Sequence, residues 1–142
     1  MTAKEYLSQP SALMEEIRRD LDNLADLRSI VEKVTTNLSF TAGRNPSKDP
    51  YAFESAMLDI RTEEEKIWEK TEKLKKMLLE VTRQINSIPG RYNARLLRKR
   101  YIEGKTWRII AAELNVSYEY VFELHQAALQ EFANSLADLS VS

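Results

Sequence analysis

Basic side chains between residues 91 and 108 form the part of the chain with the most evident chemistry. Seven arginines and lysines fall in this stretch against one carboxylate, that of Glu103, which leaves a local excess of six positive charges. Such an excess suits contact with the phosphates of a nucleic-acid backbone. The side chains predicted to contact phosphate are Arg91, Arg95, Arg98 and Lys105. Two other interpretations stay open: a solvated basic helix without a partner, and pairing of this segment with the acidic N-terminal half of the chain.

The chain has few residues that could take part in catalysis. His125 is the only histidine and the chain has no cysteine, so a histidine-rich metal site and a cysteine-ligated zinc site are excluded. The run Glu63–Glu64–Glu65 is not expected to bind a metal, because three successive residues of a helix point in different directions. The sequence has neither a glycine-rich phosphate loop nor a nucleophile elbow. We therefore expect a protein that is not an enzyme and uses no cofactor or metal, with His125 in a structural role.

Composition bounds the class of protein. The 142 residues suffice for one domain or two small ones, and 43% apolar with 30% charged residues fits a globular or coiled-coil protein. The net charge of −1 is no reason by itself to expect nucleic acid, so charge has to be considered region by region. No apolar run approaches the roughly 18 residues of a membrane span, and the first residues lack the apolar stretch of a signal peptide. We expect a cytoplasmic protein that has no contact with a membrane.

Helix-favouring residues fill the stretches between a few glycines and prolines. A short helix is predicted from Thr2 to Gln9, ended by Pro10, and a longer one begins near Ser11. Apolar residues recur along the longer helix every three or four positions, as one face of a helix requires. This stripe comprises Ile17, Leu21, Leu24, Leu27, Val31, Val34 and Leu38. The polar segment 40–50 contains two prolines and a glycine, and it is predicted to be a loop.

A second long helix is predicted from about Tyr51 to Ile88. Its stripe follows a seven-residue repeat over eleven positions, nine of them apolar, which is typical of a coiled coil. The stripe comprises Phe53, Met57, Ile60, Glu64, Ile67, Thr71, Leu74, Leu78, Val81, Ile85 and Ile88. The two stripes favour an antiparallel helical hairpin, and the second helix extends beyond the first by about 11 residues, or roughly 16 Å. The short N-terminal helix, the C-terminal part of the chain or a second copy could cover this extension, and we expect a homodimer through the long helices.

The pair Pro89–Gly90 ends the second helix and opens a new region. Residues 90–142 are predicted to form a separate domain of three helices. These helices are expected at residues 92–102, 107–114 and 117–135. The predicted fold is therefore all-α, with a long coiled-coil-like hairpin over residues 1–89 followed by a C-terminal three-helix domain.

The connections within the C-terminal domain have a distinctive pattern. Thr106 is predicted to cap its second helix and Ser117 its third. Asn115 lies at the corner between them, where it tolerates the left-handed backbone that a tight turn requires. The small residue Ala111 lies where the helices cross. Two short helices joined by about three residues in this way are typical of a DNA-binding helix–turn–helix.

The run from Leu97 to Ser117, LRKRYIEGKTWRIIAAELNVS, resembles region 4 of bacterial sigma factors, the domain that recognises the upstream element of a promoter. Val121, Leu124 and Phe132 continue the pattern. The arrangement of a helical N-terminal part followed by this domain is similar to small phage-encoded regulators of Gram-positive bacteria. Among these are late-operon activators of the ArpU type and related uncharacterised phage proteins.

The resemblance implies that the third helix reads base edges in duplex DNA. By position, its base-facing residues would be Tyr118, Glu119, Phe122 and Glu123. A glutamate can accept a hydrogen bond from the cytosine amino group, and an aromatic ring can contact the methyl group of thymine. Sigma factors usually place several arginines on this helix, whereas from Ile110 to Ser142 this chain has five acidic residues and no lysine or arginine. Those carboxylates would repel phosphate.

Two functions are compatible with these features. The first is a sequence-specific DNA-binding transcription regulator, phage-encoded, that reads promoter DNA with helix 117–135. The alternative is a protein–protein interaction module, in which the hairpin binds RNA polymerase or another phage protein without direct DNA binding. The acidic third helix and the aromatic residues Tyr118, Tyr120 and Phe122 favour the alternative.

Overall fold

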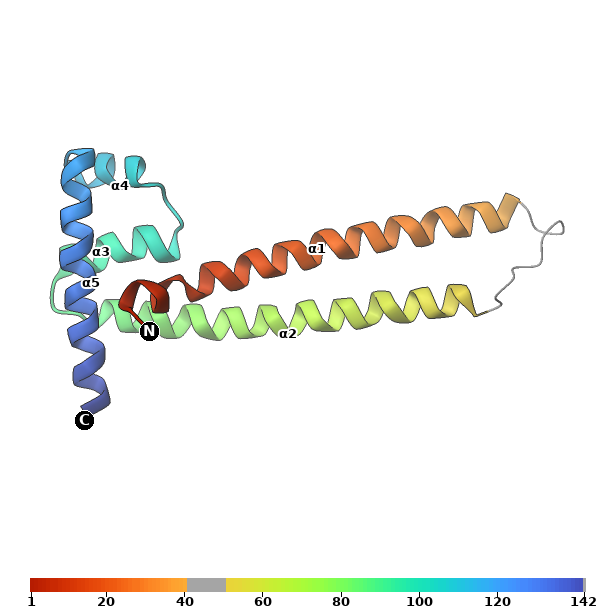
Figure 1. Ribbon diagram of the computed structural model, residues 1–142, viewed down its shortest axis with the longest axis horizontal. Coiled ribbons are helices and arrows are strands. Elements are labelled where there is room, and N and C mark those ends of the chain that lie inside the picture. Colours follow the sequence, from red (N-terminus) through yellow and green to blue (C-terminus); the bar gives the residue numbers. More distant parts are fainter. Residues whose placement is uncertain (41–50, 142) are drawn as a thin grey trace. The chain divides into compact units, whose positions relative to one another are not determined.

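The computed structural model describes residues 1–40 and 51–141, almost all of them helical (Figure 1). The helices are α1 (Ala3–Phe40), α2 (Ala52–Asn86), α3 (Arg91–Leu97), the π-helical turn η1 (Arg98–Ile102), α4 (Trp107–Leu114) and α5 (Tyr118–Val141). Neither described range contains a β-strand. The predicted all-α class and the two long N-terminal helices are confirmed. Phe40 ends α1, and the rest of the loop predicted at 40–50 lies outside the described residues.

Packing divides the chain into two compact units. One, the hairpin unit, is Met14–Lys73; the other, the helix–turn–helix unit, combines Met1–Leu13 with Leu74–Ser142. This division differs from the one expected at residues 89 and 90. Pro89–Gly90 separates two helices, but it does not separate compact units, because the last turns of α2 share a core with the helices that follow.

In the hairpin unit α1 and α2 run antiparallel (Figure 1). Asp20 on α1 forms an ion pair with Lys70 on α2 at 2.6 Å, and Arg28 forms one with Glu64 at 2.7 Å. Higher residue numbers on α1 therefore meet lower numbers on α2. The polar residue Glu64, which interrupts the predicted stripe, thus has a partner on the facing helix.

The hydrophobic core of the hairpin unit is small. Its buried residues are Leu24, Val31 and Ile60. Phe53 and Met57, which belong to the predicted stripe, are each 44% exposed, so the stripe is only partly covered within the unit.

Helix α1 continues through Pro10, where the sequence predicts a break. Proline has no N–H, so the carbonyl of Tyr6 lacks its usual helical partner. Pro10 is almost completely buried, as is Leu7 one turn before it. Burial of these apolar side chains offsets the missing hydrogen bond. The prediction of a separate N-terminal helix was wrong because it considered the local backbone alone.

The core of the helix–turn–helix unit joins both chain segments. Leu7 of α1 and Ile85 of α2 are buried in the same cluster as Phe132 of α5. Tyr6 donates a hydrogen bond from its hydroxyl to Oε1 of Gln84 at 2.6 Å, and its ring centroid lies 6.0 Å from that of Phe132. The start of α1 and helix α5 thereby cover the C-terminal extension of α2. This extension therefore needs no second copy of the chain to bury it.

Candidate nucleic-acid interface

Local hydrogen bonds build the turn that connects α4 to α5. At the start of α4, Oγ1 of Thr106 accepts a hydrogen bond from the N–H of Ile109 at 3.3 Å. At the start of α5, Oγ of Ser117 accepts one from the N–H of Tyr120 at 3.1 Å. Between them Asn115 adopts a left-handed backbone with φ 60° and ψ 44°. The predicted caps and corner are confirmed, and they determine which residues stand in the first turns of α5.

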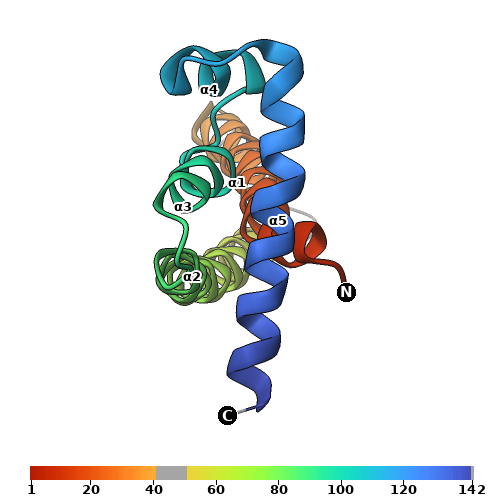
Figure 2. The ribbon, with the colours of Figure 1, turned by 90° about the vertical axis from the view of Figure 1, so that its left-hand side faces the viewer.

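The inner face of α5 packs against α3 and α4, which lie beside it in Figure 2. Val121 and Ala128 on this face are completely buried, and Ala111 on α4 is only 4% exposed. The small side chain of Ala111 lets the two helices approach closely, as expected for this motif. Because one face of α5 is packed against the core, the opposite face of its first turns is exposed.

All four predicted base-facing residues lie on that outer face. Tyr118 is 43% exposed and Phe122 38%, and the side chains of Glu119 and Glu123 are exposed as well. The rings of Tyr118 and Phe122 meet edge to face, with centroids 5.1 Å apart. Within the described part of the chain, neither glutamate has a hydrogen-bond or ion-pair partner. The face thus combines two adjoining rings with two free carboxylates.

Two arginines lie next to these rings. The guanidinium carbon of Arg108 is 5.1 Å from the ring centroid of Tyr118, and that of Arg100 is 4.6 Å from the ring of Trp107. Trp107 in turn lies 5.5 Å from Phe122. We call these five residues the aromatic–arginine cluster. The roles of Arg100 and Arg108 could not be predicted from the sequence, because their contacts join side chains of different elements around the turn and follow no spacing rule.

Arg91, Arg95 and Arg98 form a basic stripe along α3 and the start of η1. Their spacings of four and three place them on one side of the helix. Arg91 and Arg95 are exposed and have no carboxylate partner among the described residues. Arg98 donates a hydrogen bond to the amide oxygen Oδ1 of Asn86 at 2.5 Å, a neutral partner that leaves its positive charge uncompensated. Three of the four predicted phosphate contacts therefore keep their full charge.

The fourth, Lys105, is engaged within the chain. Its Nζ lies 2.8 Å from Oε1 of Glu113, and Lys99 pairs with the same carboxylate at 2.5 Å. The hydrogen bond to Glu113 raises the pKa of Lys105, and the hydrogen bonds from Lys105 and Lys99 lower the pKa of Glu113. A phosphate would have to compete with Glu113 for these two ammonium groups.

His125 is buried behind the aromatic–arginine cluster. Only 5% of it is exposed, its Nε2 lies 2.6 Å from the hydroxyl of Tyr101, and its ring centroid lies 4.4 Å from that of Trp107. Burial lowers its pKa to about 4, and the positive charges of Lys4 and Arg100 act in the same direction. The neutral ring thus packs as part of the core that supports Trp107.

Within residues 1–40 and 51–141, no three histidine, cysteine, aspartate or glutamate side chains come together as a metal site would require. None of the described helices is both long and apolar enough to cross a membrane. Comparison of the chain with protein-family models, with curated proteins and with solved structures finds no match.

Proposed function

We propose that the chain is a sequence-specific duplex-DNA-binding transcription regulator of the phage-encoded kind, acting on promoter DNA in the cytoplasm. The observation that carries this proposal is the exposed outer face of α5, formed by Tyr118, Glu119, Phe122 and Glu123, with Arg108 over the ring of Tyr118. A helix that follows a tight turn, with its inner face buried and its first turns free, suits insertion into the major groove.

The basic stripe supplies the contact with the DNA backbone. Arg91, Arg95 and Arg98 carry charge that no carboxylate in the described ranges neutralises, and Arg108 adds a further cation beside the reading face. Phosphate contacts of this kind give affinity without sequence preference, and they position the helix that reads the bases. They also offset the repulsion between phosphate and the carboxylates of α5.

Fluorescence anisotropy of labelled duplex DNA from the protein's own locus, at several salt concentrations, tests the proposal. We expect binding that weakens steeply with salt and withstands non-specific competitor DNA. Replacing Arg91, Arg95 and Arg98 together by alanine should weaken binding and lower the slope of log affinity against log salt by about 0.9 for each phosphate that the protein no longer neutralises.

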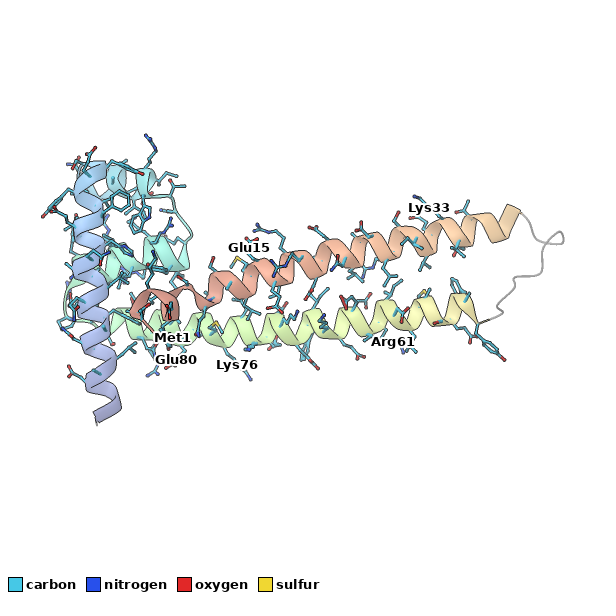
Figure 3. The ribbon with its side chains drawn as sticks, in the orientation of Figure 1. Met1, Glu15, Lys33, Arg61, Lys76 and Glu80 are labelled. Atoms are coloured by element: carbon cyan, nitrogen blue, oxygen red, sulfur yellow. The ribbon has the colours of Figure 1, made fainter. Side chains whose placement is uncertain are left out.

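The matched control removes three positive charges from the hairpin unit instead. Lys33 and Arg61, labelled in Figure 3, and Lys66 are exposed there. Replacing these three by alanine changes the net charge of the chain equally, and the salt slope should stay close to that of the wild type. Absence of duplex binding even at low salt would refute the proposal.

The exposed apolar side chains of the hairpin unit favour a second candidate, a protein–protein interaction module. Leu58 is 62% exposed and Ile30 58%, and a hollow of about 420 Å³ on α2 is lined in part by Phe53, Met57 and Leu58. Exposed apolar patches on a soluble surface often mark interaction sites. RNA polymerase, another phage protein or a second copy of the chain would be the partner.

Replacing Phe53, Met57 and Leu58 by serine separates the two candidates. If the hairpin is the functional surface, the variant should lose binding to purified RNA polymerase, or its dimeric mass in light scattering, and the wild type should not bind duplex DNA. If the chain is the DNA-binding regulator, the variant should bind duplex DNA as the wild type does. A monomeric mass of the wild type at high concentration would rule out the homodimer.

A further inference from the structure

The outer face of α5 is poor in hydrogen-bond donors. Glu119 and Glu123 are acceptors when ionised, Phe122 has no polar group, and Tyr118 has a single hydroxyl. Arginine, lysine, asparagine and glutamine, which read the acceptor atoms of purines in the major groove, are absent from these first two turns. Gln126 is the next side chain with an amide donor, and it lies a turn further along the helix.

Each base presents a different pattern to such a face. Guanine presents two acceptors, N7 and O6, which repel a carboxylate, and adenine places its acceptor N7 beside its amino group. Cytosine itself presents only a donor, the amino group N4, and thymine presents its methyl group beside the acceptor O4. Carboxylates and aromatic rings are therefore complementary to the pyrimidines.

We propose that α5 reads consecutive pyrimidines on one strand of duplex DNA, with the carboxylates of Glu119 and Glu123 accepting from cytosine N4 and the ring of Phe122 packing on thymine methyl groups. This inference rests on the proposed duplex binding, and it adds the chemical class of the site that the protein prefers.

The aromatic–arginine cluster holds the reading ring in place. The ring of Phe122 is braced by Tyr118, at 5.1 Å and 88° between ring planes, and by Trp107 at 5.5 Å. Glu119 and Glu123, four residues apart, share one face of the helix, and Phe122 lies on the adjoining face with Tyr118. The two carboxylates and the ring therefore lie side by side, which suits a site that presents amino and methyl groups on neighbouring bases.

The charge of the face is compatible with DNA only where amino groups meet the carboxylates. Glu119 and Glu123 are exposed and have no cationic partner in the part of the chain that the structure describes. The nearby cation Arg108 lies over Tyr118 and not over either glutamate. Opposite a guanine the carboxylates would be desolvated without a donor, which is unfavourable. The same groups that bind cytosine therefore discriminate against guanine.

Selection of bound duplexes from a random library with the full chain provides the sites on which the inference is tested. The selected sites are then synthesised with deoxyuridine for thymidine, which removes only the methyl group, or with 7-deazapurines, which remove only N7. We expect removal of one contacted methyl to weaken binding by about threefold to fourfold. The 7-deazapurines on the opposite strand should leave the affinity unchanged.

Three variants assign the effect to residues. Phe122→Ala should bind thymidine and deoxyuridine sites equally. Glu123→Gln should shift the selected base at one position from cytosine to adenine, because glutamine pairs with the N6 and N7 edge of adenine. Gln126→Ala is the matched control on the same helix, and it should keep the wild-type response to deoxyuridine.

The outcomes separate this inference from the proposed function. Sites that depend on purine N7 and ignore the thymine methyl would overturn the inference and leave duplex binding in place. Failure to retain any duplex at low salt would overturn both.

Discussion

The carboxylate of Glu131 on α5 accepts a hydrogen bond from the backbone N–H of Gly90, with Oε1 2.6 Å from the nitrogen. Its second oxygen accepts from the side-chain amide of Asn93. Gly90 directly precedes α3, so one side chain of α5 satisfies a free donor at the start of that helix and ties the two helices together.

A side chain at position 90 would displace the carboxylate of Glu131 from its hydrogen bonds. The φ of −76° at Gly90 is open to any residue, but a Cβ atom there would lie 2.6 Å from Oε2 of Glu131. We expect Gly90→Ala, and separately Glu131→Ala, to lower the free energy of unfolding by about 1–3 kcal/mol, the second because it leaves a half-buried N–H without its acceptor. Urea denaturation followed by circular dichroism measures both.

The double variant gives the sharper result. Once Glu131 is alanine, the added methyl at Gly90 has no carboxylate to meet, so the two losses should not add. Glu119→Ala, a free carboxylate on the same helix, should leave the stability nearly unchanged. Strictly additive losses of unfolding free energy would show that the close approach of Glu131 is not the reason why a methyl group at position 90 is unfavourable.

In the hairpin unit, Lys70 pairs with Asp20 at 2.6 Å and with Glu16 at 2.7 Å, and both Lys70 and Asp20 are largely covered. The hydrogen bond to Lys70 lowers the pKa of Asp20 below its ordinary 3.8, and the bond to Asp20 raises the pKa of Lys70 above 10.5. The stabilisation by Asp20 is present above pH 3.8 and is lost as the pH falls through its lowered pKa. The stabilisation by Lys70 is present below pH 10.5 and is lost as the pH rises through the raised pKa of this lysine.

Asp20→Asn should therefore lower the thermal midpoint of unfolding at pH 7, and its difference from the wild type should shrink as the pH falls below 3.8. Circular dichroism on melting, repeated between pH 7 and 2.5, measures this. The exposed pair of Arg18 with Glu15 offers the control, since Arg18→Ala should change the midpoint very little. An equal effect of Asp20→Asn at all pH values would contradict the ion pair.

The lowered pKa of His125 predicts a second pH dependence of the stability. It arises from burial of a neutral ring, whereas that of Asp20 arises from an ion pair. The pKa of His125 is ordinarily 6.5 and is lowered to about 4 by burial and by the charges of Lys4 and Arg100. Between these values the unfolded chain binds a proton that the folded chain does not, so stability falls as the pH drops from 6.5 towards 4. The slope should reach at most about 1.4 kcal/mol per pH unit.

Urea titrations at pH 6.5, 5.5 and 4.5 measure the slope of the unfolding free energy against pH. A variant with both His125→Phe and Tyr101→Phe removes the titrating ring without leaving the tyrosine hydroxyl unpaired, and it should flatten the dependence in this window. In a Trp68→Phe background, the fluorescence of Trp107 reports unfolding of the helix–turn–helix unit itself. A slope that persists in the double variant would assign it to other groups.

Local features of the fold could be predicted from the sequence because their causes lie within a few residues. The caps Thr106 and Ser117 and the left-handed Asn115 follow from hydrogen bonds and backbone preferences across one turn. The exposure of the predicted base-facing side chains of α5 follows from the same register, since Val121 on the inner face fixes which positions face outward.

Contacts between distant segments could not be predicted in this way. Leu7, one turn before the buried Pro10, packs in a core with the end of α2 and with α5, and no feature of the neighbouring sequence predicts these contacts. The bond from Gly90 to Glu131 spans 41 residues. Lys105 is predicted to be a free phosphate contact, yet it is held by Glu113 on α4, because the turn before α4 brings the two together.

The double pairing of Glu113 leads to a prediction about affinity that assumes the proposed DNA binding. Its single carboxylate pairs with both Lys99 and Lys105, with Lys105 held by hydrogen bonds of 2.8 and 3.0 Å. Glu113→Gln keeps the size of the side chain but releases two ammonium groups for phosphate. We expect tighter duplex binding at low salt and a slope of log affinity against log salt that steepens by about 0.9 for each additional phosphate that the protein neutralises.

Glu65→Gln, which removes one exposed charge from the hairpin unit, is the control of equal charge change, and its slope should match that of the wild type. Melting of Glu113→Gln by circular dichroism shows whether the fold persists. If the fold persists and binding still weakens, Glu113 positions the lysines for DNA and does not compete with it. In that case Lys99→Ala and Lys105→Ala should weaken binding as well, because the two lysines would be the groups that contact phosphate.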